Sequence, residues 1–184
     1  MDIQSKINLL FDKIYEDNPE LRRIVFIHSS MVANKALDIA IKKNLPLKKE
    51  DIYAAGMLHD IGVINCNAPE IHAHGNLPYI CHGIEGGKIL RENGFEKYAS
   101  VCERHTGAGL SVNDIKNQNL PLPEKDFSPQ TLLEKLICYA DKFFSKSKNL
   151  TEEKPLSKII QQMKNHGEES YYKFMQLHSL FSVE

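Results

Sequence analysis

Apolar residues recur at helical spacing along most of this chain. Residues 2–16 carry a first apolar stripe, and a second predicts a helix from about residue 21 to 43, after a break at Asp17-Asn18-Pro19-Glu20. A third helix begins near residue 48 and leads into the small and apolar residues of 54–63. No strand pattern is convincing and no internal repeat is visible. The predicted fold class is therefore all-α, a compact multi-helix bundle.

The second half of the chain continues this pattern after one interruption. Residues 65–80 are polar and contain Pro69, Gly75 and Pro78, so we expect a long irregular loop there, of the kind that serves as a lid or binding loop. Ser128-Pro129 predicts an N-cap followed by proline in the first turn. The remaining helices are predicted at residues 82–91, 95–106, 112–117, 129–145 and 156–180, the last one broken at Gly167.

Composition excludes several classes of protein. A formal net charge of −1 argues against broad nucleic-acid binding, which needs a basic face. We see no apolar run long enough to span a bilayer and no signal peptide, so we expect no membrane partner and a cytoplasmic location. The four cysteines are scattered without a C-x-x-C pair, which disfavours both a disulfide framework and a cysteine-rich zinc site.

Six side chains of metal-ligand type fall on the apolar sides of the predicted helices. His28 lies four residues after Ile24 and four before Val32, so these three side chains share a face. Asp60 lies about 100° around the helix from His59, so it can share a site with His59 and also face a second centre. The same test gives the full set: His28, His59, Asp60, His82, His105 and Asp141.

For each of these residues alone, a hydrogen-bonded core side chain or a local ion pair is the alternative interpretation. The six residues come from five different helices, however, and each would then need a separate partner in the core. One or two divalent cations would satisfy all six together, because imidazole and carboxylate groups are good ligands for such ions. The sequence therefore predicts a metal site inside the bundle.

The order of these residues resembles that of the HD-domain superfamily, and Leu58-His59-Asp60-Ile61-Gly62 is similar to its HDIG variant. The resemblance runs from about Leu21 to Phe144. It implies a single HD domain over residues 1–184, with a core at about 21–146. The N-terminal helix at 2–16 and the C-terminal stretch at 156–180 would pack on that core.

The resemblance also implies a binuclear metal site. One ion would bind His28, His59, Asp60 and Asp141. A second would bind His82 and His105, with Asp60 bridging the two. The identity of the ions is open among Fe, Mn, Zn, Ni, Co and Mg. The Gly-Tyr-Pro signature of HD-GYP cyclic dinucleotide phosphodiesterases is absent from the sequence, which lowers the expectation of that substrate.

The chemistry that we expect is hydrolysis of a small phosphoester or phosphoanhydride, such as a nucleotide, by metal-activated water. His59 and Asp60 would act within the ligand set, and Arg104 and Lys142 are candidates for cations that face the phosphate. Lys88 and Arg23 are weaker candidates. For each of these cations, a solvated surface position is the alternative.

Two other functions share the same residues. Some relatives with six ligands are di-iron oxygenases that cleave C–C or C–P bonds, and a non-catalytic module that senses a nucleotide is a third hypothesis. We expect a small phosphorylated molecule as the partner, and a homodimer is left open. His72 and His74, in a loop that could cover the site, are expected to be exposed rather than ligands.

Overall fold

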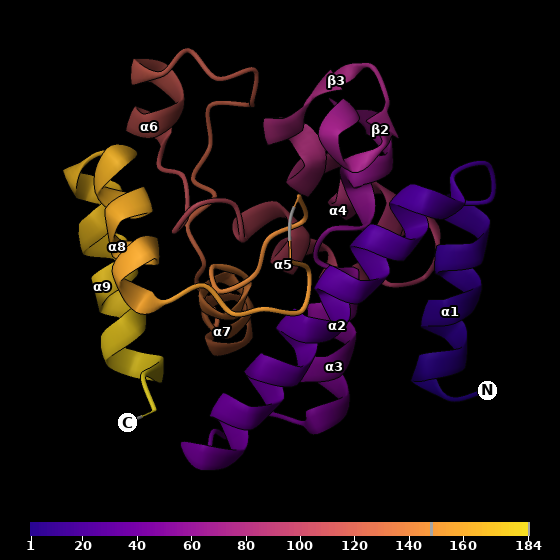
Figure 1. Ribbon diagram of the computed structural model, residues 1–184, viewed down its shortest axis with the longest axis horizontal. Helices are drawn as coiled ribbons and strands as arrows, with labels where there is room; N and C mark the ends of the chain where they lie inside the picture. The colour runs from indigo at the N-terminus through magenta and orange to yellow at the C-terminus, as the bar shows by residue number, and fades with distance from the viewer. Residues whose placement is uncertain (148, 184) are drawn as a thin grey trace.

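Helix α2 (Pro19–Lys42) runs diagonally through the middle of the structure, and α1, α3 and α7 pack against it (Figure 1). The computed structural model describes residues 1–147 and 149–183. Its helices confirm the predicted class, with only a small sheet added. The other α-helices are α1 (Ile3–Ile14), α3 (Lys49–Leu58), α4 (His82–Glu92), α5 (Ala99–Arg104), α6 (Val112–Asn117), α7 (Leu132–Asp141), α8 (Leu156–Asn165) and α9 (Glu168–Phe181).

Local capping residues explain where two of these helices begin. Pro19 opens α2 as predicted, and the side chain of Asn18 accepts a hydrogen bond of 3.0 Å from the backbone N–H of Leu21. The predicted cap at Ser128 is wrong. Thr131 caps α7 instead, because its hydroxyl accepts from the N–H of Glu134 while the Glu134 carboxylate accepts from the N–H of Thr131. The helix also ends at Asp141, before the predicted residue 145.

Helix α2 is long and apolar enough, by length and composition, to cross a membrane, so our expectation that no such run exists is wrong. Half of its most apolar window is buried inside the structure. The buried residues of α2 include His28 as well as apolar side chains such as Val25 and Val32. A central core helix passes the same test of length and composition, and α2 occupies that position here (Figure 1).

The prediction that residues 65–80 form a loop without strands is also wrong. This segment contains β1 (Cys66–Ala68), β2 (Ala73–His74) and β3 (Leu77–Pro78), in the order β2-β1-β3. Strands β1 and β2 are antiparallel, and β1 and β3 are parallel. Strands of two or three residues are too short for an alternating pattern to be visible in the sequence. The 3₁₀ turn η2 (Pro69–Ile71) lies between β1 and β2, and a second turn, η3 (Tyr79–Cys81), follows β3 and leads into α4.

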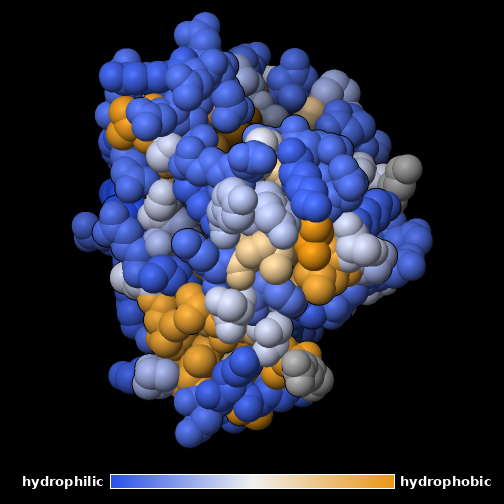
Figure 2. All heavy atoms as spheres, turned by 90° about the vertical axis from the view of Figure 1, so that its left-hand side faces the viewer, coloured by the Kyte–Doolittle hydropathy of each residue, from blue (hydrophilic) through white to orange (hydrophobic). Residues whose placement is uncertain are grey.

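The helices at the predicted positions 112–117 and 156–180 are confirmed, including the break at Gly167, which has a φ of 113°. The predicted helix at 95–106 is divided into the 3₁₀ turn η4 (Glu96–Tyr98) and the short α5. Helices α8 and α9 form one side of the molecule. Apolar side chains gather on the lower half of that face, and the upper half is mostly hydrophilic (Figure 2).

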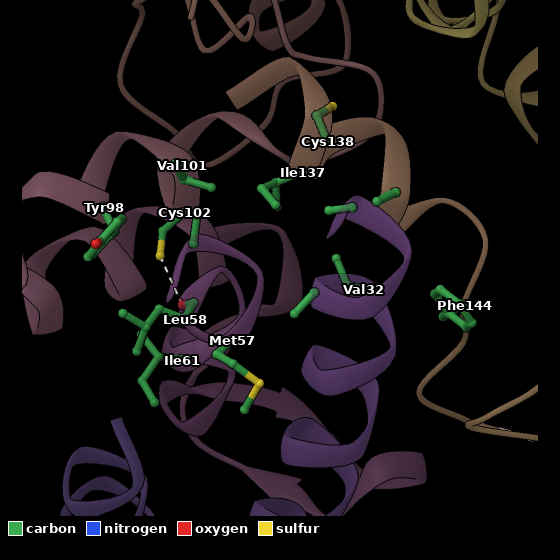
Figure 3. Close-up of a cluster of buried hydrophobic side chains, with 14 of the residues drawn as sticks. Val32, Met57, Leu58, Ile61, Tyr98, Val101, Cys102, Ile137, Cys138 and Phe144 are labelled. Atoms are coloured by element: carbon green, nitrogen blue, oxygen red, sulfur yellow. Dashed lines mark hydrogen bonds between the residues drawn. The ribbon is translucent and has the colours of Figure 1, made fainter. Parts of the chain in front are cut away.

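Part of the hydrophobic core packs around the C-terminal end of α3. Leu58 and Met57 of α3 pack in one buried cluster with residues of α2, α5 and α7 (Figure 3). The thiol of Cys102 donates a hydrogen bond of 3.1 Å to the backbone carbonyl of Leu58. The chain then continues through the 3₁₀ helix η1 (Ile61–Asn65), and Ile61 extends the same cluster. This packing fixes the residues on either side of the His59-Asp60 pair.

Candidate metal centre

Two close backbone contacts bring the predicted ligand helices together. A Cβ atom on Gly56 would lie 2.6 Å from the Cα of Ala33, so α3 can approach α2 this closely only with glycine at that position. Gly62 makes a second such contact, because a Cβ there would lie 2.2 Å from both the N of Gly86 and the O of His82. Gly62 is therefore needed for this close approach and not for a left-handed turn, since the glycines with positive φ among the described residues are Gly94, Gly107, Gly109 and Gly167.

The structure brings all six predicted side chains to one place, in two groups that share Asp60. In the first group, Nε2 of His28 lies 3.1 Å from Oδ2 of Asp60, and Nε2 of His59 lies 3.0 Å from the same oxygen. Oδ1 of Asp141 completes this group at 3.0 Å from Nε2 of His28 and 3.5 Å from Nε2 of His59.

The second group uses the other oxygen of the same carboxylate. Oδ1 of Asp60 lies 3.5 Å from Nε2 of His82 and 3.3 Å from Nε2 of His105. The two Nε2 atoms are 3.0 Å apart. Asp60 is fully buried, and His82 and His105 are almost so. One carboxylate therefore faces two separate clusters of ligand atoms with one oxygen each.

Backbone carbonyls fix the orientation of three of the four imidazole rings. Nδ1 of His59, His82 and His105 each lies 2.7 Å from the carbonyl oxygen three residues earlier, on Gly56, Tyr79 and Cys102. A carbonyl oxygen can only accept, so each Nδ1 donates its proton there. In the neutral ring this leaves a lone pair on Nε2. Histidine ligands of metals are oriented in the same way, by a hydrogen bond from the second ring nitrogen.

Protonation does not relieve the contact between His82 and His105. Burial, followed by the neighbouring His105, lowers the pKa of His82 to about 3, and burial also lowers the pKa of His105. Both rings are therefore neutral near pH 7, with two lone pairs and a carboxylate oxygen directed at each other. Among the described residues, Oδ1 of Asp60 accepts no hydrogen bond of normal geometry. A cation between these atoms would satisfy them, so the residues fit a divalent metal.

The first group differs in its charge. Burial lowers the pKa of His59, but the carboxylates of Asp60 and Asp141 outweigh it and raise the pKa to about 9. Burial raises the pKa of Asp60, yet His59 and Lys146 together bring it well below its usual range. This cluster is consequently rich in ionised groups, and a divalent cation would bind here by displacing the His59 proton.

Two lysines from the end of α7 and the segment after it approach the carboxylates. Nζ of Lys142 lies 2.8 Å from Oδ2 of Asp141 and donates a hydrogen bond of 3.2 Å to the carbonyl of His105. It thereby holds a ligand of the first group against a ligand of the second. Nζ of Lys146 lies 2.6 Å from Oδ2 of Asp60. The structure thus brings Lys142 to the site, where its ammonium is already occupied by these two partners.

The other predicted cations lie in different surroundings. The guanidinium of Arg104 pairs with Glu134 at 3.3 Å, which ties the end of α5 to the first turn of α7. Arg23 pairs with Glu20, and Lys88 with Glu85, both at the surface. A phosphate-facing role for Arg104 stays a prediction, and its position in the structure is that of a link between helices. His72 and His74 are exposed, as expected.

Lys146 and Tyr79 are two residues at the site that sequence reasoning missed. The ring of Tyr79 packs on the ring of His82, with centroids 4.7 Å apart and an interplanar angle of 30°. Both residues lie outside the long helices, so helical periodicity gave them no inward assignment. The only sequence signal for Lys146 is its spacing of four residues from Lys142, just beyond the end of the helix predicted at 129–145.

Several known proteins are similar to this chain in sequence. An uncharacterized protein of Methanocaldococcus jannaschii is 35% identical over 144 residues, which are 76% of this chain and 78% of that protein. Two tRNA (cytidine(56)-2'-O)-methyltransferases also match. The one from Picrophilus torridus is 33% identical over 55% of this chain, and the one from Thermoplasma volcanium is 27% identical over 85%. These matches span only 26% and 41% of the methyltransferases themselves.

A solved structure shows the same fold. The HD domain of the L. monocytogenes phosphodiesterase PgpH, in complex with cyclic-di-AMP, superposes with a TM-score of 0.53 and 18% identity. The match covers 95% of this chain and 98% of that one. The family model described as HD domain matches residues 25–145, a range that contains all six residues of the two ligand groups. The chain therefore belongs to the HD domain family.

Proposed function

We propose that this protein is a metal-dependent phosphohydrolase that acts on a small phosphoester or phosphoanhydride, such as a nucleotide. One observation carries the proposal: Asp60 directs its two carboxylate oxygens into two ligand groups that are otherwise built from histidines and Asp141. When bound in such a pair of sites, divalent cations activate water for attack and stabilise charge on a phosphoryl oxygen.

The residues of this chain supply the rigid frame for that chemistry. Three imidazole rings are held by backbone carbonyls, so their Nε2 atoms cannot turn away from Asp60. Lys142 fixes the carboxylate of Asp141. The burial of these groups keeps most water away from them, which strengthens their interaction with a charged ligand.

The cysteines do not offer an alternative nucleophile. Burial raises the pKa of Cys66 to about 12 and the pKa of Cys138 to about 11, and it also raises the pKa values of Cys81 and Cys102. All four are therefore thiols rather than thiolates near pH 7, and a thiol is a poor nucleophile. A mechanism in which water is the nucleophile agrees with this chemistry.

The matched proteins support the proposal in different degrees. The L. monocytogenes protein is named a phosphodiesterase, and it shares the fold with this chain at low identity. The methyltransferases extend far beyond the matched segment, so their named activity does not describe this chain. Their match does favour a second candidate function, a nucleotide-sensing module that acts with another domain or protein.

Metal analysis combined with a substrate screen would test the proposal. The protein would be purified without added metal, analysed for its elements, and then assayed against nucleotides and phosphate esters with Mn²⁺, Zn²⁺, Co²⁺, Ni²⁺, Mg²⁺ or Fe²⁺. We expect up to two ions per chain and release of phosphate or of a phosphomonoester. Bound iron with the spectroscopic signature of a di-iron site and no hydrolysis would favour an oxygenase. Nucleotide binding without turnover under every metal would favour the sensing module.

A further inference from the structure

A cavity of about 260 Å³ lies beside the two ligand groups. One wall comes from the segment between β1 and α4, with Glu70, Ile71 and Tyr79, and the other from the segment after α7, with Phe144 and Lys146. These two segments are far apart in the sequence and come together only at the metal centre. The cavity is therefore formed by the fold and not by a single loop.

Two of the lining residues contact the ligand groups directly. The ammonium of Lys146 lies 2.6 Å from Oδ2 of Asp60, and its side chain is 14% exposed. The ring of Tyr79 packs against His82 and lies 6.0 Å from the same ammonium. Lys146 thus marks the inner end of the cavity, next to the first ligand group, and Tyr79 forms the wall next to the second.

We propose that this cavity is the substrate subsite of the metal centre, that it accepts a small phosphomonoester, and that Lys146 is the residue that positions the phosphate. The reaction at this subsite is that of the proposed hydrolase, on which the inference rests. The class of substrate is inferred from the cavity. The ammonium of Lys146 is carried on a flexible side chain, so it can leave the Asp60 carboxylate and bind phosphate oxygens instead. It keeps a negatively charged partner throughout. Lys142 is less suited to this role, because Asp141 and the His105 carbonyl already bind its ammonium.

The size and charge of the cavity restrict the ligand further. The cavity is open to solvent, and its volume lies below the range of about 300–1,000 Å³ that is typical for drug-sized ligands, so it can enclose a phosphate with a small attached group but only part of a cyclic dinucleotide or a polynucleotide. Tyr79, Phe144 and Ile71 provide aromatic and apolar walls. The exposed carboxylate of Glu70 would repel a second phosphate group at the rim of the cavity. It would favour a ligand that presents hydroxyl groups there.

Orthophosphate binding to the manganese-loaded protein, measured by calorimetry, tests the role of Lys146. We expect Lys146→Met to bind orthophosphate about 10- to 100-fold more weakly, the loss of one charge-assisted hydrogen bond. Lys146→Arg should recover part of the affinity. Lys116→Met, which removes an exposed lysine on α6 that pairs with Glu124, is the matched control and should behave as wild type. Unchanged orthophosphate affinity in Lys146→Met, at unchanged metal content, would overturn the proposal.

A second measurement needs only the wild-type protein and stays decisive if Lys146→Met loses metal. AMP, ADP and cyclic di-AMP would compete with orthophosphate at equal concentrations. We expect AMP to displace orthophosphate most strongly, and equal or stronger displacement by ADP or cyclic di-AMP would contradict the assigned substrate class. If orthophosphate binding depends on Lys146 while no phosphoester is hydrolysed, the hydrolase proposal fails and the subsite stands. If phosphoesters are hydrolysed while orthophosphate binding does not depend on Lys146, the subsite fails and the hydrolase proposal stands.

Discussion

The Nε2 atoms of His82 and His105 lie 3.0 Å apart, and no proton is available to join them. Each ring donates its Nδ1 proton to a backbone carbonyl, and burial keeps both rings neutral near pH 7. Their lone pairs and Oδ1 of Asp60 face the same point. A divalent cation is the group that would turn this arrangement of electron-rich atoms into a stable one.

The first prediction concerns this pair. The double variant His82→Ala with His105→Ala should lose one metal equivalent and retain the other, since the first group keeps all four of its own ligands. Elemental analysis of the purified variant gives the stoichiometry. His72→Ala with His74→Ala, which alters two exposed histidines, is the matched control. Equal metal content in the double variant and the wild type would refute the binuclear assignment.

The second prediction concerns Asp60, the residue that the two ligand groups share. Asp60→Ala should lose both metal equivalents and all hydrolytic activity, because it removes the oxygen that each group uses. Asp38→Ala, on the exposed side of α2, removes a carboxylate that among the described residues pairs only with Lys42, and it should leave metal content and activity unchanged. Metal content and turnover are measured together on the same preparations. Wild-type turnover in Asp60→Ala would refute the proposed mechanism.

The third prediction concerns the approach of η1 to α4. Gly62→Ala should destabilise the protein by about 1–3 kcal/mol or more, because the added methyl group would meet backbone atoms of Gly86 and His82 that cannot move independently. Gly87→Ala is the control, since its methyl group would meet the flexible side chains of Glu103 and Arg91. Urea denaturation gives both free energies of unfolding. Equal losses in the two variants would contradict the assigned role of the close contact.

The fourth prediction concerns the pH dependence of stability. Lys97 and Tyr98 donate hydrogen bonds to Asp51, and these bonds lower its pKa against the opposing effect of burial. A carboxyl with a lowered folded-state pKa stabilises the protein above its unfolded value, near 3.9, and this contribution disappears as the pH falls through the folded value.

Asp51→Asn should therefore be less stable than the wild type by about 1–2 kcal/mol near neutral pH, as expected for hydrogen bonds to a charged group that is largely buried. The difference should be constant from about pH 6 to 8 and shrink below about pH 4. Denaturation curves at several pH values measure it. A difference between the two proteins that grows on acidification would show that the sign assigned to Asp51 is wrong.

Helical periodicity alone predicted much of the framework and the inward direction of the six ligand-type residues. The start of α2 and the break at Gly167 follow from local features, namely a proline in the first turn and a glycine, which has a positive φ in the structure. The short sheet at residues 66–78 and the start of α7 at Thr131 did not follow. Strand pairing joins residues that carry no periodic signal. Thr131 and Glu134 do have the local spacing of a capping box, but Ser128-Pro129 is a competing signal three residues earlier, and only the hydrogen bonds of the structure decide between them.

The sequence by itself determined the all-α class and the six ligand-type residues, because helical periodicity and side-chain chemistry are local properties of the chain. The tertiary structure alone decided that the two oxygens of Asp60 face different groups, and that Lys146 rather than Arg104 lies against the shared carboxylate. His28 and Asp141, 113 residues apart, meet at 3.0 Å only through the packing of α2 against α7. Such distances depend on close contacts between helices, and no local pattern encodes them.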